Sequence, residues 1–272
     1  MEHRNIAFIG AGNMTRSIIA GLISSGYPKD KITATNPSTE KLEHLEKCYG
    51  INTSTNNMTA AENADVIVLA VKPQMMATAA EPLQTIDYST KLVISIAAGI
   101  SAKRLNEMFA TDLNLVRVMP NTPALVGKGM SGLFAIEHIS EQDKTYASDL
   151  MSAVGEVCWV EKESGINSVI AAAGSAPAYF FLFMEAMQAE AMKQGFSEDT
   201  ARLLVQQSAL GAAEMVVANP DTQLSTLREQ VTSKGGTTAE ALRTFNEHKL
   251  QEIVAKAMQA AVSRAEEMES LF

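Results

Sequence analysis

The chain has 272 residues, enough for two domains that each have a hydrophobic core. Its composition, 46% apolar and 19% charged, is typical of a soluble globular protein, and its formal net charge of −9 argues against nucleic acid as the main partner. Cys48 and Cys158 do not have the spacing of metal ligands, and we expect no metal site. Because we find no signal-peptide pattern and no stretch that approaches the length of a membrane span, we expect a cytoplasmic protein without a membrane partner.

The first motif is the segment from Ile6 to Met14, in which an apolar strand, a glycine turn and a helix follow one another. Gly10 suits the sharp exit from the strand, and Gly12 lets the backbone approach a pyrophosphate at the start of the helix. This order is typical of the opening of a dinucleotide-binding βαβ unit. Thr15 stands at the third position of the fingerprint, where Gly or Ala is usual. The alternative interpretation is a tight turn that binds no cofactor.

Strands and helices alternate through the first part of the chain. Apolar runs predict strands at residues 6–9, 32–35, 51–53, 66–70, 92–96 and 115–118. Between them we expect a helix that ends near residue 26, and helices at 39–49, 59–63, 75–83 and 102–109. Residues 130–135 and 157–160 would add edge strands, and residues 141–154 one more helix. The fold class predicted is α/β, with an N-terminal Rossmann-like, doubly wound parallel sheet.

The pattern changes near residues 161–165, after which long helical runs rich in Ala, Met and Leu replace the strands. We expect helices at 177–194, 198–218 and 250–271. The chain is therefore divided into a dinucleotide-binding domain, residues 1–163, and an all-helical domain, residues 164–272. Apolar and small residues lie on more than one face of these helices, and we favour a second copy of the chain as their cover.

Open α/β sheets bind ligands at the carboxyl ends of their strands. Three segments there are built of small, polar or turn-forming residues: 70–73, 96–99 and 117–123. Lys72 is either a solvated loop lysine or a contact to ribose or phosphate. Asn121 lies in a loop with a proline on either side, and we interpret it as an amide that orients the cofactor, with a rigid turn as the alternative.

The segment after the second strand indicates which dinucleotide is bound. An Asp or Glu there usually accepts hydrogen bonds from the ribose of NAD, but residues 35–39 contain no carboxylate, and the first is Glu40. Neutral hydroxyl and amide groups can donate to a 2′-phosphate that an acid would repel. The missing acid favours NADPH, with NADH as an alternative donor. Lys41 either assists or is solvated.

The second informative stretch, residues 227–242, contains a Gly235-Gly236 turn. Thr237 and Glu240 have the spacing of a capping box, which predicts a helix beginning near Thr238. A turn of this kind entering a helix offers clustered N–H donors that suit a small carboxylate. The alternative is only a well-capped helix start.

Five segments together resemble the Δ1-pyrroline-5-carboxylate reductase family, in the same order and nearly from end to end. They are Gly10–Met14, Ala70–Pro73, Met119–Ala124, Gly174–Tyr179 and Val231–Thr238. Lys234 and Ala176 depart from the family, which usually has Pro and Gly there, but the donor-bearing residues are kept. The resemblance implies reduction of the cyclic imine to L-proline, the last step of proline biosynthesis. It also implies a homodimer through the C-terminal helices, with a decamer as the larger alternative.

The resemblance further implies a set of site residues. The cofactor would contact Ile9, Gly10, Ala11, Gly12, Asn13, Met14, Ala70, Val71, Lys72, Pro73, Ala97, Ala98 and Gly99, with Asn36 and Ser38 near the 2′-phosphate and Asn57 near the adenine. The substrate carboxylate would lie on the N–H groups of Gly236, Thr237 and Thr238. The Thr238 hydroxyl would meet the ring nitrogen, either to relay a proton or only to position the ring.

Two other functions are kept as alternatives. A β-hydroxyacid dehydrogenase joins similar domains, but its chemistry needs a lysine on the first helix of the second domain, and residues 166–173 contain none. A non-catalytic NADP(H)-binding regulator would share the nucleotide domain alone.

Overall fold

The structure is a computed structural model, and it describes residues 2–271. Contacts within the chain define two compact units. The first runs up to Pro177 and takes in the chain again from Ala260, and the second comprises Ala178–Gln259.

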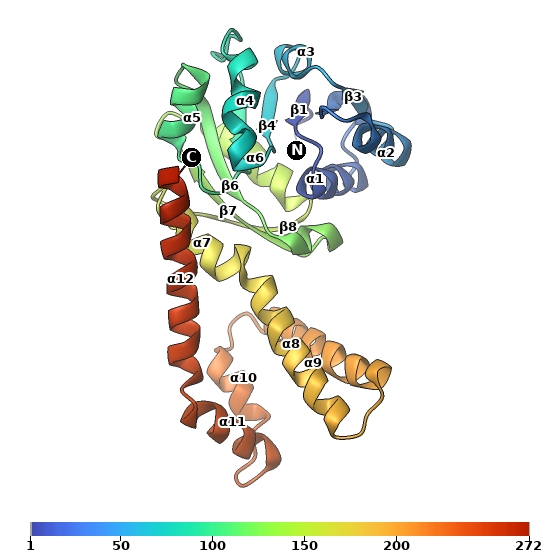
Figure 1. Ribbon diagram of the computed structural model, residues 1–272, viewed down its shortest axis with the longest axis vertical. Helices are drawn as coiled ribbons and strands as arrows, with labels where there is room; N and C mark the ends of the chain where they lie inside the picture. Colours follow the sequence, from blue (N-terminus) through green and yellow to red (C-terminus); the bar gives the residue numbers. More distant parts are fainter. Residues whose placement is uncertain (1, 272) are drawn as a thin grey trace. The chain divides into compact units, whose positions relative to one another are not determined.

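The first unit is built on an eight-stranded sheet with the order β3-β2-β1-β4-β5-β6-β7-β8 (Figure 1). The strands are β1 Ile6–Ile9, β2 Ile32–Thr35, β3 Asn52–Ser54, β4 Val66–Leu69, β5 Leu92–Ser95, β6 Asn114–Met119, β7 Gly129–Ala135 and β8 Gly155–Trp159. Neighbouring strands are parallel except for the pair β6 and β7. The prediction of a doubly wound parallel sheet is confirmed for β1 to β6, and both added strands are present. The expectation that both would be edge strands is wrong for β7, which lies between β6 and β8 and runs antiparallel to β6, so that only β8 is at the edge.

The helices of this unit cover both faces of the sheet. They are α1 Asn13–Ser24, α2 Thr39–Tyr49, α3 Asn57–Glu62, α4 Met76–Ala80, α5 Ala102–Phe109, α6 Glu141–Ser152 and α7 Gly165–Val169, with 3-10 turns at Lys29–Lys31, Pro73–Met75, Glu81–Leu83 and Thr122–Val126. The single helix expected over residues 75–83 is instead α4 followed by a 3-10 turn that contains Pro82. Proline lacks an N–H and clashes with the preceding turn, so an α-helix does not continue through it.

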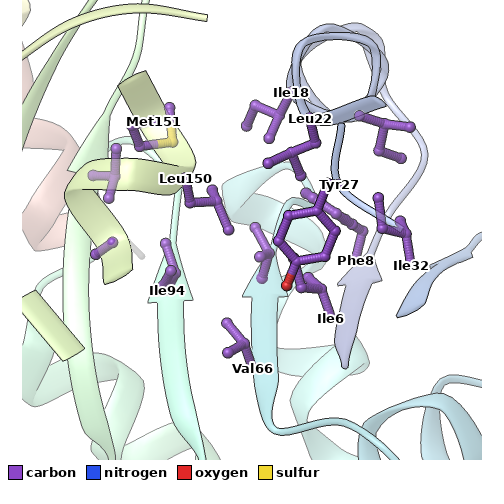
Figure 2. Packing of buried hydrophobic residues seen from close by; sticks show 14 of the residues in the cluster. Ile6, Phe8, Ile18, Leu22, Tyr27, Ile32, Val66, Ile94, Leu150 and Met151 are labelled. Carbon is purple, nitrogen blue, oxygen red and sulfur yellow. The ribbon is translucent and has the colours of Figure 1, made fainter. Parts of the chain in front are cut away.

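Two separate cores result from the alternation of side chains along each strand. Ile6 and Phe8 of β1 face α1, α2 and α6, and Figure 2 shows them packed with Ile18, Leu22 and Leu150 (Figure 2). Ala7 and Ile9 face the opposite way, into the core under α3, α4 and α5. A strand that is buried on both faces has a continuous run of apolar residues in its sequence, and for this reason the sequence predicted β1, β4 and β5.

The register brings the carboxyl ends of the central strands level. Ile9 pairs with Thr35 on one side and Leu69 on the other, and Leu69 pairs with Ser95. The loops that leave β1, β2, β4 and β5 therefore start from one rim of the sheet.

The second unit is entirely helical within the residues described. Its elements are α8 Ala176–Lys193 from Ala178 on, α9 Glu198–Ala218, α10 Leu224–Gln230, α11 Thr237–Glu247 and the first part of α12 Leu250–Leu271. Large apolar side chains are exposed on α8 and α9, among them Phe180 and Leu182, each 67% exposed. The prediction of an all-helical C-terminal part is confirmed.

One expectation about membranes needs correction. A π-helix at Ile170–Gly174 joins α7 to α8, so that Gly165–Lys193 is one run of 29 residues, long and apolar enough by length and composition to cross a membrane. The sequence did not predict this run, because Gly174 and Pro177 are typical of a break between two helices. Pro177 instead occupies the first turn of α8, where its missing N–H costs nothing.

Candidate dinucleotide and substrate sites

The turn after β1 is held by a close contact with the loop after β4. Gly10 has φ +111°, and a Cβ at this position would lie 2.6 Å from the carbonyl oxygen of Ala70. The Gly10 N–H donates to the Thr35 oxygen at 3.0 Å. Thr15 is fully buried, and its hydroxyl donates to the Gly10 oxygen at 2.8 Å. The Thr15 side chain therefore fits the position where Gly or Ala usually allows close packing of the helix on the strand, and it adds a hydrogen bond across the turn.

The start of α1 offers the room and the donors that a pyrophosphate needs. Gly12 is the N-cap residue, and no atom lies within 4 Å of the Cβ it lacks. Among the residues described, the N–H groups of Asn13 and Met14 have no hydrogen-bond partner. Free N–H groups and the helix dipole attract an anion to such a terminus.

The polar residues after β2 hold one another in place. Asn36 donates from Nδ2 to the Ser38 hydroxyl at 2.8 Å, and Ser38 precedes the first turn of α2. The buried Thr35 hydroxyl donates to Oδ1 of Asn57 at 2.6 Å, which fixes the start of α3 beside the same rim. No carboxylate lies between Thr35 and Thr39.

The loops after β4 and β5 complete the rim. Lys72 is exposed in the first loop, as a phosphate or ribose contact requires. In the second loop Gly99 has φ +72°, and a Cβ there would lie 2.9 Å from Cβ of Met268. The last turns of α12 therefore pack on this loop, a contact that local sequence patterns could not reveal.

Asn121 has a structural task in addition to any contact with a ligand. Its side-chain amide donates to the Ala173 oxygen at 3.0 Å, and its Oδ1 accepts from the Met130 N–H at 2.8 Å. Ala173 belongs to the π-helix, whose wider turn frees carbonyl groups. With 8% exposure, the Asn121 side chain joins β7, the loop after β6 and the π-helix. These contacts fit the alternative interpretation of Asn121 as part of a rigid turn. That the Asn121 amide also orients a cofactor stays a prediction.

A buried ion pair that no sequence pattern predicted lies near the rim. Arg117 of β6 is 2% exposed and contacts Glu163 at 2.5 Å and Glu269 of α12 at 3.3 Å. Glu163 also accepts the N–H of Ala102 at the start of α5, at 2.6 Å. An arginine inside a predicted strand was the only available signal, and its two partners are distant in the sequence.

The Gly235-Gly236 turn differs from its prediction in two respects. The N-cap of α11 is Gly236, and no side chain caps the helix, so the prediction of a capping box is wrong. Thr237 is the first helical residue, and the Glu240 carboxylate accepts a hydrogen bond from Arg243. That pairing lowers the pKa of the Glu240 carboxyl. The Gly236 N–H donates to the Ser233 oxygen at 3.0 Å and is not available to a substrate, which corrects the expectation for this group.

What is left at this terminus is a smaller set of donors. The N–H groups of Thr237 and Thr238, and the Thr238 hydroxyl, have no hydrogen-bond partner among residues 2–271. Both threonines are exposed. The terminus can therefore hold one carboxylate on two N–H groups and offer a hydroxyl beside it.

A curated relative matches the whole chain. The pyrroline-5-carboxylate reductase of Vibrio alginolyticus is 70% identical over 272 residues, covering 100% of both chains. The chain belongs to the pyrroline-5-carboxylate reductase family. The family model described as pyrroline-5-carboxylate reductase dimerisation matches residues 163–268, and the model described as NADP oxidoreductase, coenzyme F420-dependent, matches residues 5–99.

Solved structures of the reductase family share the fold. The enzyme of Coxiella burnetii is 42% identical with a TM-score of 0.93, covering 98% of this chain and 99% of its own. The pyrroline carboxylate reductase of Plasmodium falciparum, solved with NADP bound, is 29% identical with a TM-score of 0.87, covering 99% of both chains. The rim residues of the first unit and the free donors of α11 thus lie in a chain whose full length matches reductases.

Proposed function

We propose that this protein reduces the C=N bond of Δ1-pyrroline-5-carboxylate with NADPH to form L-proline, the last step of proline biosynthesis. The observation that carries the proposal is the full-length identity of 70% to a pyrroline-5-carboxylate reductase. A β-hydroxyacid dehydrogenase is disfavoured because residues 166–173, which form most of α7 and most of the π-helix, contain no lysine that could serve as acid and base.

The residues of the rim fit a phosphorylated dinucleotide. In the proposal, the pyrophosphate lies over Gly12 on the free N–H groups at the start of α1, because nothing fills that space. Asn36 and Ser38 lie near the 2′-phosphate, Asn57 near the adenine, and the loops 70–73 and 97–99 along the ribose and nicotinamide. When bound, NADPH supplies a hydride from C4 of its nicotinamide. The missing acid after β2 favours NADPH over NADH, which remains the alternative donor.

The donors of α11 fit a five-membered imino acid. The N–H groups of Thr237 and Thr238 would hold its carboxylate, and the Thr238 hydroxyl would hydrogen-bond the ring nitrogen. An imine protonated on nitrogen is already electrophilic, so the protein needs neither a nucleophile nor a metal. Its contribution is orientation of the ring, which by itself accounts for a large part of a rate enhancement.

The proposal includes a homodimer. The apolar side chains exposed on α8 and α9 would be removed from water at an interface with a second copy of the chain, and the family model that matches residues 163–268 is described as a dimerisation domain. A second copy of the chain, and not lipid, would then explain the apolar run Gly165–Lys193 in a cytoplasmic enzyme. We propose residues 1–163 as the dinucleotide-binding domain and residues 164–272 as the substrate-binding and dimerisation domain. A decamer of such dimers is the alternative assembly, and light scattering distinguishes the two.

The deciding assay follows the loss of reduced-nicotinamide absorbance when the protein is mixed with NADPH and pyrroline-5-carboxylate. Turnover to proline supports the proposal. Formation of NADPH from NADP+ and 3-hydroxy acids, measured in a separate assay, would support a β-hydroxyacid dehydrogenase, and NADPH binding without turnover of either substrate would support a regulator.

Thr238 provides the sharper test of the site. Thr238→Ala should lower kcat/KM for the imine by about 100-fold, the lower range for removing a group that moves or holds a proton, with the KM for NADPH unchanged. Thr238→Ser keeps the hydroxyl and should retain most activity. Thr244→Ala is the matched control, because Thr244 lies later on the same helix and bonds the Glu240 oxygen at 3.1 Å. Equal rates for Thr238→Ala and the wild type would exclude this role.

A further inference from the structure

The loop between β5 and α5 is held at two points by residues that are distant in the sequence. A Cβ on Gly99 would lie 2.9 Å from Cβ and 3.1 Å from Cε of Met268, which belongs to the last turns of α12. Three residues later the N–H of Ala102, the first residue of α5, donates to Oε1 of Glu163 at 2.6 Å. The loop is therefore packed against α12 at its middle and bonded to a carboxylate at its end.

These two contacts meet at one buried side chain. The guanidinium of Arg117, which is 2% exposed, contacts Oε1 of Glu163 at 2.5 Å and Oε1 of Glu269 at 3.3 Å. Glu269 directly follows Met268 in α12. Because a buried charge is costly unless it is paired, Arg117 keeps both carboxylates beside it. Arg117 thereby joins the two contacts that hold the loop.

Glu269 has a second donor in Asn167 of α7. Nδ2 of Asn167 donates to Oε2 of Glu269 at 3.4 Å, and Asn167 is 3% exposed. Oδ1 of Asn167 is buried and has no hydrogen-bond partner in the part of the chain that the structure describes. An unpaired buried oxygen costs stability, and the one hydrogen bond that the amide makes is long. The Asn167 amide therefore adds little to stability, and its contribution is to orient the Glu269 carboxylate.

We propose that Glu269 is a positioning residue for the nicotinamide half of the dinucleotide, and that it acts through Arg117 and Met268 on the loop 97–99. The inference rests on the proposed function, in which this loop lies along the ribose and nicotinamide. A shift of the loop would move the ring away from the imine carbon, and a misplacement of about 1 Å can cost about 100-fold in rate. Glu269 holds the loop in place and does not itself contact the dinucleotide.

The test compares the binding of NADPH and of 2′,5′-ADP to the full chain by calorimetry. The second probe has the adenosine half of the cofactor but no nicotinamide. Glu269→Gln keeps the size of the side chain and removes its charge, so it should weaken NADPH about 10-fold and leave 2′,5′-ADP within about 2-fold. Met268→Ala removes the side chain that packs on Gly99 and should weaken NADPH about 3-fold. In Glu269→Gln the kcat for the imine should also fall about 10-fold or more.

A second variant separates positioning from a loss of stability. Asn167→Leu removes the donor to Glu269 together with the unpaired oxygen, so the urea midpoint should be kept or should rise while the affinity for NADPH falls about 3-fold. A merely structural role would make the two quantities change together. Glu267→Gln is the matched control, because Glu267 lies in the same turn of α12, is 62% exposed and pairs with Arg264. It should change neither dissociation constant.

The proposal is overturned if Glu269→Gln weakens both probes equally or weakens neither, or if Asn167→Leu keeps the wild-type affinity for NADPH. Turnover separates this inference from the proposed function. If the wild type binds NADPH but does not reduce pyrroline-5-carboxylate, the proposed function fails, and the ratio of the two dissociation constants in Glu269→Gln still decides whether Glu269 positions the nicotinamide half. A wild type that binds neither probe overturns both.

Discussion

Replacing Gly10 by alanine should destabilise the fold, whereas the same change at Gly12 should weaken only cofactor binding. At Gly10 the backbone has φ +111°, which costs a residue with a Cβ about 1–2 kcal/mol. The new methyl would lie 2.6 Å from the Ala70 oxygen, and overpacking of this kind costs about 1–3 kcal/mol. The free energy of unfolding should therefore fall by about 2–5 kcal/mol, the sum of the two effects.

At Gly12 the same methyl meets no protein atom. The residue has φ −81° and ψ −177°, which any amino acid adopts, and nothing lies within 4 Å of the added Cβ. We expect the stability of Gly12→Ala to stay within about 1 kcal/mol of the wild type, the size of an N-cap effect. The space is the one assigned to the pyrophosphate, so the Kd for NADPH should rise by about 10-fold or more, equivalent to at least about 1.4 kcal/mol.

Urea unfolding of both variants without cofactor and titration with NADPH, followed by nicotinamide fluorescence, separate the two effects. Wild-type stability of Gly10→Ala would refute the argument from the contact with Ala70. Wild-type affinity of Gly12→Ala for NADPH would refute the placement of the pyrophosphate.

Two further predictions concern stability. Arg117→Met should lower the unfolding free energy by about 3 kcal/mol, the low end of the range for removing one partner of a buried ion pair, because Glu163 and Glu269 are 31% and 25% exposed. Adding Glu163→Gln should restore part of the lost stability. An unchanged urea midpoint would contradict the role of the ion pair. Burial and the contact with Tyr27 raise the pKa of the Tyr146 hydroxyl. A raised pKa stabilises the fold below the unfolded value of about 10, and this contribution is lost as pH rises above it. Tyr146→Phe should therefore reduce the alkaline fall in stability by up to about 1.4 kcal/mol per pH unit, and identical slopes in stability measured against pH would exclude the effect.

Much of the fold could be predicted because its signals are local. The strands β1 and β4 are continuous apolar runs, since both of their faces are buried, and their ends match the prediction within a residue. The turn at Gly10 and Gly12 was recognisable because a strand, a turn and a helix follow one another within one short segment. The family motifs are local in the same sense, and the full-length comparison agrees with them.

The predictions about the site failed where a side chain or N–H group is bonded to a distant or unexpected partner. The sequence could not show that the Asn121 amide is engaged by Ala173 and Met130, or that the Gly236 N–H is already bonded to Ser233. It placed Thr237 as a cap, but the chain enters α11 one residue earlier, because Gly236 adopts the extended N-cap conformation.

The sequence by itself determined the order of strands and helices, the two-part organisation and the kind of ligand that the glycine turns can hold, because these follow from hydrophobic periodicity and from the freedom of glycine. Only the tertiary structure decided which side chains remain free. It buried Arg117 against Glu163 and the end of α12, and among the residues described it left the N–H groups of Thr237 and Thr238 without a hydrogen-bond partner. Whether a charged group is neutralised depends on residues far away in the chain, and that information exists only once the chain is folded.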